Sequence, residues 1–563
     1  MSSASTSHRR LAALLWPQLR PRLGPLALAL GLGLVIAALS AAQPLLMRIV
    51  VDDGLIGRHY ARLLLACLGM LLIAVSGLLL GALHRVLYVR LSGRILFALR
   101  GDAYAHLLRV SPRRLAEWPV GDLVARLDGD VAEVQRFGTD ALATAVSAAL
   151  AVAAAAAVML ALSWRLTLLV AALLPLQLLI RHLARPRIEL STRRLREQAG
   201  RIGSFLVETL SNARALQAAA AERLELERLA ALNEDYLGRV LRQQLVAYGT
   251  GSAAAFVGHL ATATAFVAGG WYALNGSLTT GTLIAFVAYL GRSSGSAGSL
   301  LGLYTGYQRA RVSLERLGTL FDLPVVLERA DAVPLPAHAR GALKLEQLTL
   351  TLPGAARPLL AALDLEIPAG TKLLLSGASG VGKSTLADLL RRFVEPDSGT
   401  VLLDGVPLDH YRLEDLRRRI VVVEHSPTLF RGSILDNLRY GHPQANEAAV
   451  LEAALHAGVE EFVRELPGAY LTSVGEGGAG LSTGQQQRIA IARAALADPL
   501  IVILDEATSG LDLESARAVH QAVDDSFPRR TRIVITHHAA QVGQPGLSLV
   551  LEGGLLKAAA GDP

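Results

Sequence analysis

The sequence predicts two parts of different class, an α-helical membrane domain followed by an α/β domain. Six long apolar stretches fall within the first 310 residues. Residues 1–310 contain 31 Arg, no Lys and 17 acidic side chains, whereas residues 311–563 contain 24 basic and 31 acidic ones. Beyond residue 343, short β-rich runs alternate with helical segments, a pattern typical of a parallel sheet with crossover helices.

Each apolar stretch is long enough to cross a bilayer, which takes about 20 helical residues. The mean hydropathy is +0.40 and 52% of the residues are hydrophobic, above the usual range of soluble domains. One such stretch also occurs as a buried helix of a globular protein, but six in succession favour membrane spans. They cover residues 26–49, 63–83, 141–162, 166–180, 252–271 and 280–304, with a turn at Arg165 between the third and fourth.

The charges of the loops predict the orientation in the membrane. Residues 85–140 carry nine Arg and residues 181–246 carry twelve, whereas the alternate loops carry two or fewer. Arginine-rich loops stay in the cytoplasm, so both ends of the chain are expected there. Their helical periodicity predicts membrane helices that continue far into the cytoplasm, rather than a separate soluble insertion. A basic, apolar half also fits membrane loops better than nucleic-acid binding.

The domain boundaries follow from these changes along the chain. Residues 1–22 are expected to form an amphipathic segment at the membrane surface, and residues 23–310 the transmembrane domain. Residues 311–340 are expected to form a linker, and residues 341–563 the α/β domain. The only cysteine, Cys67, excludes disulfides and cysteine-based metal sites within one chain.

A glycine-rich run follows one strand-like segment and opens a helix. It matches G-x-x-x-x-G-K-[ST], in which backbone N–H groups and the helix N-terminus surround phosphate oxygens. Lys383 is placed to reach the β and γ phosphates, and the hydroxyl of Ser384 is placed to bind Mg²⁺. The second part is therefore predicted to be an α/β P-loop nucleotide-binding domain. The expected ATP-binding residues are Gly377, Ala378, Ser379, Gly380, Val381, Gly382, Lys383, Ser384 and Thr385.

Two acids end a later apolar run. Residues 500–504 lead directly into Asp505 and Glu506. Because ligands bind at the carboxyl edge of a parallel sheet, both carboxylates are expected beside the phosphate loop. Asp505 is placed to hold the hydration shell of the metal ion, and Glu506 to polarise an attacking water. A strand cap would account for one of these acids but not for both.

A third motif, residues 481–488, reads Leu-Ser-Thr-Gly-Gln-Gln-Gln-Arg and opens another helix. Together with the phosphate loop, the acidic pair and His537, it resembles the ATP-binding-cassette exporters, half-transporters of the multidrug, lipid and peptide group. The resemblance covers nearly the whole chain, and the motifs stand in the order and spacing of the family. It implies an ATP hydrolase coupled to transmembrane transport, with ATP and Mg²⁺ bound at the nucleotide site.

The resemblance implies further roles for single residues. Chains of this family pair head to tail, so that ATP in one phosphate loop meets the third motif of the other chain. Asp512 resembles a residue of the loop that links the two ATP sites. His537 resembles the switch histidine that contacts the γ-phosphate and the attacking water. The residues implied at the partner's ATP are Ser482, Thr483, Gly484 and Gln485.

The same resemblance implies a partner chain. A second copy of this chain is expected, with a paralogous half-transporter as the alternative, because the catalytic side chains are all present and the third motif is only mildly altered. Glu476 resembles the element that touches the cytoplasmic loops of the membrane domain. Residues 121–130 and 211–218 resemble the coupling helices of those loops.

Three positions depart from the family pattern. Leu352 stands where an aromatic side chain usually stacks on adenine; it covers the base but loses stacking of about 1 kcal/mol. His425 stands at the metal-binding glutamine, although Mg²⁺ prefers oxygen, so either His425 acts through water or Glu424 substitutes for it. Thr483 replaces a glycine, and its side chain either crowds the partner's phosphates or adds a hydrogen-bond donor.

The sixth apolar stretch contains a run of small and polar residues, 291–299. Such residues line a wet cavity rather than face lipid. An arginine at membrane depth is costly, so Arg292 marks either a functional site or a structural partner. The expected substrate cavity contains Arg292, Ser293 and Ser296, and substrate contact there would favour a cargo with an anionic group.

These expectations combine into one function. The sequence predicts ATP-driven export of a hydrophobic or amphipathic substrate (lipid, peptide or drug-like) by alternating access, with ATP hydrolysed between two nucleotide-binding domains. The alternatives are half of a heterodimer with one weak ATP site, an importer on the same fold, and a nucleotide-gated regulator with little hydrolysis. The expected location is a bacterial inner membrane, as a multi-pass protein in contact with lipid and without nucleic acid.

Overall fold

The computed structural model describes residues 16–352, 355, 357–475, 478, 480–509, 511–537, 542 and 544–558. The chain divides into two compact units. The first comprises Met1–Ala105 and Val120–Asp322, and the second comprises His106–Pro119 and Leu323–Pro563. The second unit therefore contains a short piece of the N-terminal half, with helix α4 (Pro112–Ala116), in addition to the C-terminal part.

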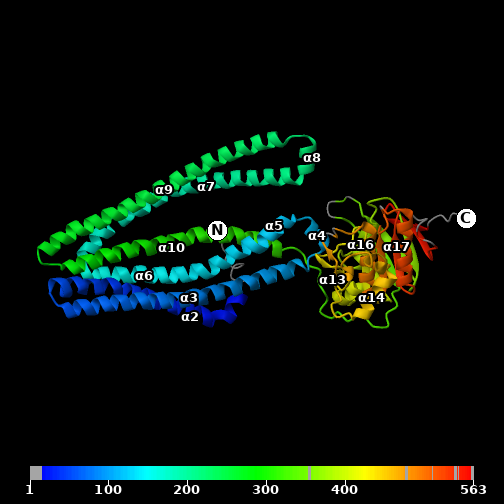
Figure 1. The fold of residues 1–563 in the computed structure, drawn as a ribbon, viewed down its shortest axis with the longest axis horizontal. Helices are drawn as coiled ribbons and strands as arrows, with labels where there is room; N and C mark the ends of the chain where they lie inside the picture. The colour runs from blue at the N-terminus through cyan, green and yellow to red at the C-terminus, as the bar shows by residue number, and fades with distance from the viewer. Residues whose placement is uncertain are drawn as a thin grey trace. The chain divides into compact units, whose positions relative to one another are not determined.

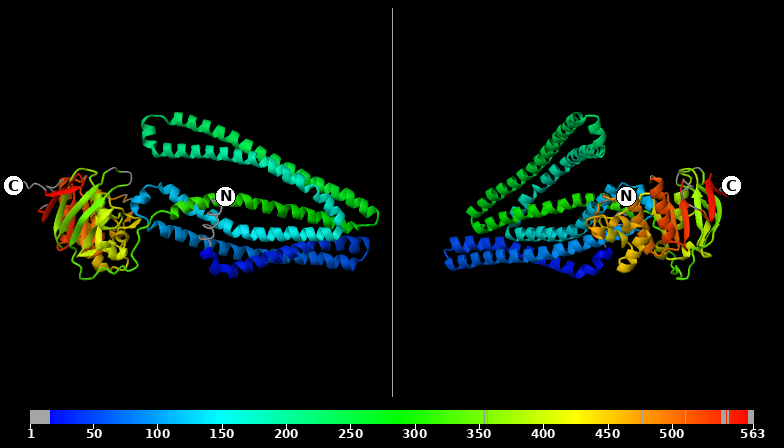
Figure 2. Two further views of the ribbon diagram at one scale, coloured as in Figure 1. Left: turned by 180° about the vertical axis from the view of Figure 1, so that it is seen from behind. Right: turned by 45° about the vertical axis from the view of Figure 1, so that its right-hand side comes forward.

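The first unit is built from long helices that run side by side (Figure 1; Figure 2). α10 packs along α6 and α7 packs along α9, and the short helix α8 (Ala213–Ala218) closes the α7–α9 hairpin at its tip. The basic segment 181–246 is thus helical over most of its length, which confirms the predicted helical extensions. The long helices are α2 (Leu23–Ile49), α3 (Tyr60–Leu107), α6 (Val131–Ala171), α7 (Leu174–Ser211), α9 (Glu222–Leu274) and α10 (Thr280–Phe321).

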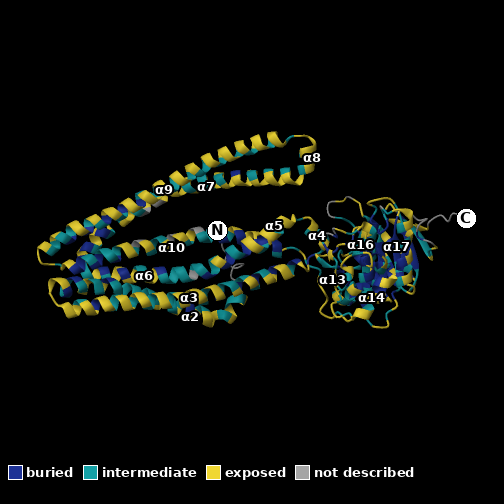
Figure 3. Cartoon of the chain, in the orientation of Figure 1, coloured by how far each residue is buried: buried dark blue, intermediate teal, exposed yellow. Residues whose placement is uncertain are grey.

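The outward faces of these helices are apolar and exposed (Figure 3). Four leucines of α3, namely Leu71, Leu72, Leu78 and Leu79, are 61–74% exposed. Apolar helix surfaces of this extent fit contact with hydrocarbon. Within the described residues, four helical segments are long and apolar enough to cross a membrane: Trp16–Ile56, Tyr60–Leu107, Val120–Ala171 and Glu222–Leu274.

Two of the six predicted spans lie partly or wholly outside those four segments, each for a physical reason. The fourth, residues 166–180, is divided between α6 and α7, because the helix is interrupted at Ala172 and restarts with Pro175 in its first turn. The sixth lies within α10, which is one continuous helix, but Arg292 and its serine and glycine neighbours lower the hydropathy.

The break between the third and fourth predicted spans lies inside α6. Ser163 has φ −165° and ψ 100°, which is not helical. Its hydroxyl accepts a hydrogen bond from the N–H of Leu166 at 3.4 Å and so caps the helix that follows. This break confirms the change of direction predicted at the neighbouring Arg165.

The short helices between the long ones include the predicted coupling segment and one piece of chain that was not predicted. The predicted coupling segment 121–130 forms α5 (Val120–Ala125) and η3 (Arg126–Asp130), which belong to the first unit. A separate piece, His106–Pro119, groups with the α/β unit, and there Val110 forms a β-bridge with Val325. Sequence periodicity did not single out so short a helix as α4. Glu476 lies outside the described residues.

A parallel sheet forms the centre of the second unit. Its strand order is β12-β11-β3-β10-β9-β6, with β12 antiparallel to β11 and the other pairs parallel. A smaller antiparallel sheet has the order β2-β1-β4-β5. The strands of the two sheets are β3 (Lys372–Ser376), β6 (Ile420–Glu424), β9 (Ile501–Asp505), β10 (Thr531–Ile535), β11 (Leu547–Glu552) and β12 (Leu555–Ala558), with β1 (Leu343–Leu350), β2 (Leu360–Ile367), β4 (Ser398–Leu403) and β5 (Val406–Pro407).

Both faces of the parallel sheet are buried. In β3, Leu373 and Leu375 enter a core shared with the antiparallel sheet, whereas Leu374 enters a second core on the opposite face. The second core packs against α16 (Thr483–Leu496) and α17 (Leu513–Ser526), which lie beside each other (Figure 1). Burial on both faces explains why these strands are continuous apolar runs in the sequence. This sheet confirms the predicted α/β fold.

Candidate functional site

The phosphate loop connects β3 to α11 (Lys383–Leu390). Gly377 has φ 149° and Gly382 has φ 111°, where any side chain would be strained. A Cβ on Gly377 would lie 2.4 Å from the carbonyl oxygen of Leu551, so only glycine permits this approach to β11. The loop leads directly into the N-terminus of α11, whose unpaired N–H groups and dipole favour phosphate oxygens.

The side chain of Lys383 is held by backbone carbonyl groups of the phosphate loop. The side chain is 4% exposed, and its Nζ donates hydrogen bonds to the carbonyl oxygens of Gly377 and Ala378, both at 2.9 Å. The same Nζ lies 3.3 Å from Nε2 of His537 and 3.9 Å from Oε1 of Glu506. Phosphate oxygens can replace these acceptors at little cost, because the buried cation already stands at the loop.

Glu506 and His537 approach Lys383 from neighbouring strands. β3, β10 and β9 are adjacent in the sheet, His537 follows β10, and Glu506 follows β9. Oε1 of Glu506 lies 2.9 Å from Nε2 of His537. Glu506 has φ 51°, and its N–H donates to the carbonyl oxygen of Ile535 at 2.9 Å. A backbone conformation this uncommon orients the carboxylate at the site.

Asp505 and Ser384 provide oxygen ligands for a divalent cation. Burial raises the pKa of the Asp505 carboxyl, and the neighbouring Ser384 hydroxyl partly counters that rise. Within the described residues, Oδ1 of Asp505 is buried without a hydrogen-bond partner. Mg²⁺ typically takes one or two protein oxygens and completes its shell with nucleotide phosphates and water. These residues therefore fit Mg²⁺.

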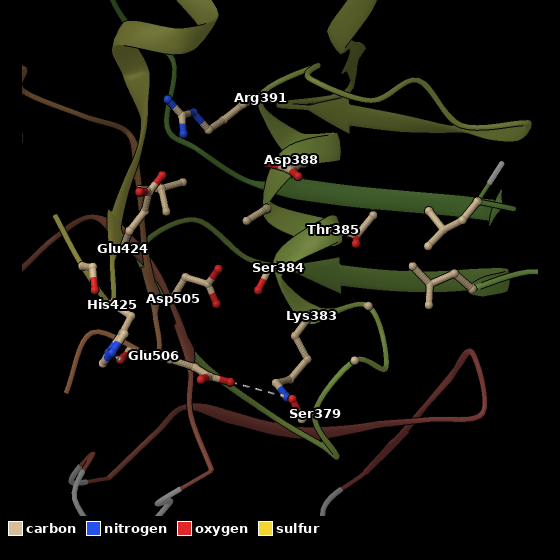
Figure 4. A pocket seen from close by; sticks show the side chains of 17 residues that line it. Ser379, Lys383, Ser384, Thr385, Asp388, Arg391, Glu424, His425, Asp505 and Glu506 are labelled. Atoms are coloured by element: carbon tan, nitrogen blue, oxygen red, sulfur yellow. Dashed lines mark hydrogen bonds and ion pairs between the residues drawn. The ribbon is translucent and has the colours of Figure 1, made fainter. Parts of the chain in front are cut away.

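A pocket of about 530 Å³ opens beside these groups (Figure 4). Leu352 lines its apolar side and packs on the core, as expected for a side chain that covers a base. Gly377, Ala378, Val381 and His537 do not line it. The predicted residues that do line it are Ser379, Gly380, Gly382, Lys383, Ser384, Thr385, Leu352, His425, Asp505 and Glu506.

His425 lines the pocket, but its ring is held by a neighbouring loop. Nδ1 of His425 lies 2.8 Å from the hydroxyl of Ser509 and 3.3 Å from the carbonyl oxygen of Glu506. The buried side chain of Gln487 donates to the carbonyl oxygens of Glu424 and His425, at 2.9 and 2.6 Å. Sequence reasoning did not anticipate these contacts, because no motif connects Gln487 or Ser509 with His425.

Two charged residues of the pocket also escaped the sequence analysis, Asp388 and Arg391. Asp388 lies in the last turn of α11 and Arg391 follows directly after the helix. Both lie at the end of the pocket away from Lys383 (Figure 4). Burial raises the pKa of Asp388 and lowers the pKa of Arg391, and each charge partly counters the shift of the other. The i,i+3 spacing after the phosphate loop was the available signal.

The residues of the third motif, 481–488, do not line this pocket. Ser482 caps α16, since its hydroxyl accepts from the N–H of Gln485 at 3.3 Å and the Gln485 side chain accepts from the N–H of Ser482 at 2.9 Å. Ser482 and Thr483 are exposed, and Gly484 has open space around it. Asp512 caps α17 through the N–H of Ser515, at 3.0 Å. None of these residues lines the ATP pocket of its own chain.

The membrane unit contains a cavity of about 830 Å³ between α2, α6 and α10. Arg292 and Ser296 line it, as predicted. Ser293 does not, and its hydroxyl donates instead to the carbonyl oxygen of Tyr289 at 2.8 Å. The hydroxyl of Tyr289 donates to the carbonyl oxygen of Ala41 and joins α10 to α2 at the cavity wall. The structure thus corrects one of three predicted cavity residues.

A helical membrane unit joined to an α/β unit with this phosphate site defines a transporter energised by nucleotide hydrolysis. The family model described as ABC transporter transmembrane region matches residues 26–296, and the model described as ABC transporter matches residues 360–509. The chain belongs to the ABC transporter family. It is an integral membrane protein that binds ATP and couples its hydrolysis to transport.

Similar proteins are found across the full length. The ATP-dependent lipid A-core flippase of Thiobacillus denitrificans is 32% identical over 98% of this chain and 95% of its own length. The protein of that name from Chromobacterium violaceum is 31% identical over 93% of this chain and 90% of its own. The structure of a bacterial Atm1-family ABC exporter with ATP bound superposes with a TM-score of 0.79 at 25% identity, covering 96% and 94% of the two chains.

Proposed function

We propose that this chain exports a lipid-like amphipathic molecule across a bacterial inner membrane, as one half of a dimer. The observation that carries the proposal is the pairing, in one chain, of the Lys383–Glu506–His537 cluster with a membrane cavity that contains Arg292. The relatives named as lipid A-core flippases support a lipid as the class of cargo. They also support the bacterial inner membrane as its location.

The cluster assigns a step to each side chain. Glu506 accepts a proton from the water whose oxygen attacks the γ-phosphorus, and the bond from phosphorus to the β–γ bridging oxygen breaks. His537, 2.9 Å from Oε1 of Glu506, holds that carboxylate and the water in line. Lys383 stabilises the negative charge on the phosphate oxygens. Mg²⁺, held by Ser384 and Asp505, would neutralise further phosphate charge.

A second chain completes the ATP site in this proposal. Ser482 and the N-terminus of the 14-residue helix α16 are exposed and lie outside the ATP pocket of their own chain. A helix N-terminus favours phosphate, so the motif is suited to the ATP of a partner. A homodimer is proposed, with a paralogous half-transporter as the alternative partner. Asp512 and Thr483 would lie at this interface, where Thr483 adds a hydroxyl donor.

Arg292 gives the proposal its substrate chemistry. Within the described residues, its guanidinium makes no hydrogen bond and no ion pair, although it lines a cavity in the membrane unit. An unpaired charge at this depth is costly and is compensated when the cargo brings the opposite charge. The favoured cargo is therefore a lipid-like molecule with an anionic group, such as a phosphate.

Hydrolysis in nanodiscs tests the proposal. Glu506→Gln is expected to lower the ATPase rate by about 10²-fold or more, because it removes the base while it keeps the shape. Glu514→Gln, an exposed acid on α17, is the matched control and should leave the rate unchanged. A wild-type rate no higher than that of Glu506→Gln would exclude a pump and indicate a nucleotide-gated regulator. Lipid movement toward the ATP side in proteoliposomes would indicate an importer.

A further inference from the structure

A second cavity of about 300 Å³ adjoins the one that contains Arg292. It lies between α2, α3 and α6. Leu34, Thr144 and Ser147 line both cavities, so the two are continuous along the faces of α2 and α6. The lining positions on α6 extend from Asp140 to Ala155, which corresponds to roughly 22 Å of helix at 1.5 Å per residue.

Charged side chains gather at the end of this groove away from Arg292. Arg85, His84 and Asp140 line the second cavity. Within the described residues, Arg85 makes no hydrogen bond and no ion pair, including none with Asp140. The hydroxyl of Thr139 lies 3.1 Å from Oδ1 of Asp140. The cavity therefore presents a cation and an anion that lie near each other without a direct ion pair.

Buried hydrogen bonds hold this charged end in place. Gln135 and Thr139 of α6 are 5% and 2% exposed. Nε2 of Gln135 donates to the hydroxyl of Ser92 on α3 at 2.6 Å and to the hydroxyl of Thr139 at 2.9 Å. The hydroxyl of Tyr88 lies 3.3 Å from that of Thr139, and its ring stacks with His84 at 6.1 Å between centroids. A satisfied polar network of this kind makes α3 and α6 rigid around the cavity.

We propose that Arg85, His84 and Asp140 form a binding site for a lipid head group that carries both a phosphate and a primary amine. The site rests on the proposed lipid export and adds a second position to the cavity that contains Arg292. The phosphate lies against Arg85 and His84, and the ammonium donates to Asp140. A purely anionic head group would lie against the carboxylate of Asp140 and be repelled by it, and an uncharged one would compensate neither charge of the site.

The groove explains how one cargo uses both positions. The groove is lined mostly by small and apolar residues, nine of which are alanine, and Ser40, Thr144 and Ser147 add hydroxyls to its walls. A hydrocarbon core is about 30 Å thick, so roughly 22 Å of groove covers most of the distance a head group travels. The phosphate leaves Arg85 and reaches Arg292 along this wall, while the acyl chains stay in lipid.

Lipid binding to the full-length chain tests the site without hydrolysis. Native mass spectrometry would compare phosphatidylethanolamine with phosphatidylglycerol, which has the phosphate but no amine. The wild type is expected to bind phosphatidylethanolamine about tenfold more tightly. Asp140→Asn is expected to abolish the preference for phosphatidylethanolamine, whereas Asp140→Glu, which keeps the negative charge, is expected to retain it. Arg85→Gln weakens the binding of both lipids. The matched control, Arg90→Gln, changes an exposed arginine of α3 that lines neither cavity.

Several outcomes would overturn the site. An unchanged preference in Asp140→Asn, or equal effects of Arg85→Gln and Arg90→Gln, would exclude head-group recognition at these residues. If a variant at Arg85 or Asp140 loses the dimer in mass photometry but keeps its lipid preference, these residues contact a second chain rather than a lipid head group. Because binding is measured without ATP, the site fails independently of export, which fails when Glu506→Gln hydrolyses ATP as fast as the wild type.

Discussion

The charged side chains of the two units differ in how many protein groups they contact. In the nucleotide-binding unit, Lys383 is 4% exposed and donates to two carbonyl oxygens, with Glu506 and His537 beside it. In the membrane unit, Arg292 and Arg85 are exposed to their cavities and, within the described residues, make neither hydrogen bonds nor ion pairs. One unit arranges its charges before the ligand arrives, whereas the other leaves them for the ligand to compensate.

This difference matches what each unit binds. Every turnover presents the same triphosphate, so a rigid site with fixed donors is favoured because no reorganisation is needed at the moment of reaction. A transported molecule must bind and then leave, so charges with few protein partners suit a transient contact. Substitutions should consequently affect the two units differently: in the nucleotide-binding unit they should abolish hydrolysis, and in the membrane unit they should change selectivity for the cargo.

The largest effect is expected for Lys383→Ala. Loss of the buried cation removes the stabilisation of phosphate charge, so ATP hydrolysis should fall by about 10²-fold or more. The measurement is the ATPase rate in nanodiscs with saturating lipid. The control is Lys557→Ala, an exposed lysine paired with Glu552. Hydrolysis within a few-fold of the wild type would mean that the contacts of Lys383 are only structural.

A smaller and more selective effect is expected for Arg292→Gln. Because this side chain has no protein partner among the described residues, the unfolding temperature in nanodiscs should change by less than about 2 °C. Stimulation of ATP hydrolysis by anionic lipid should fall several-fold, while stimulation by uncharged amphiphiles should persist. Arg242→Gln on α9 is the control, since Arg242 is exposed and lines neither cavity. Equal loss for charged and uncharged amphiphiles would contradict a role in recognising an anion.

The smallest effect concerns the pH dependence of stability in the nucleotide-binding unit. His520 is buried in α17, and burial, with Lys372 nearby, lowers its pKa. The unfolded state therefore takes up a proton near pH 6.5 before the folded state does, so stability present above about pH 6.5 is lost as the pH falls toward the lowered pKa.

His520→Gln should weaken this loss. The difference in unfolding temperature between pH 7.5 and pH 5.5 should be smaller in the variant than in the wild type. The exposed His338→Gln is the control and should behave as the wild type. An identical pH difference in His520→Gln and the wild type would show that other groups dominate acid sensitivity.

Local patterns predicted the parts of the site that contiguous residues form. The phosphate loop and the acids at the end of β9 were recognised because each motif combines a strand or helix end with particular side chains. Ser482 was found through the family resemblance, and its role as the cap of α16 comes from the structure. Contacts between distant segments were missed, such as Gln487 with the carbonyl oxygens of Glu424 and His425. No local pattern encodes such a pair.

Hydropathy predicted the membrane domain but not every helix boundary. Residues 166–180 are apolar throughout, yet the helix is interrupted before α7, because backbone geometry at a proline is not visible to hydropathy. The grouping of His106–Pro119 with the nucleotide-binding unit was likewise missed. That grouping depends on contacts made at long sequence distance, such as the bridge between Val110 and Val325.

By itself, the sequence determined the class of each unit and the chemistry at the phosphate loop, because periodicity and motif are properties of neighbouring residues. Only the tertiary structure decided which charges acquire partners. Lys383 lies among carbonyls and a carboxylate because three parallel strands end at one edge of the sheet. Arg85 of α3 and Asp140 of α6 line one cavity, and the buried Gln135 joins these two helices through Ser92. Whether a charged side chain is buried, and which groups it contacts, depends on packing between residues distant in sequence, and the two units differ in that packing.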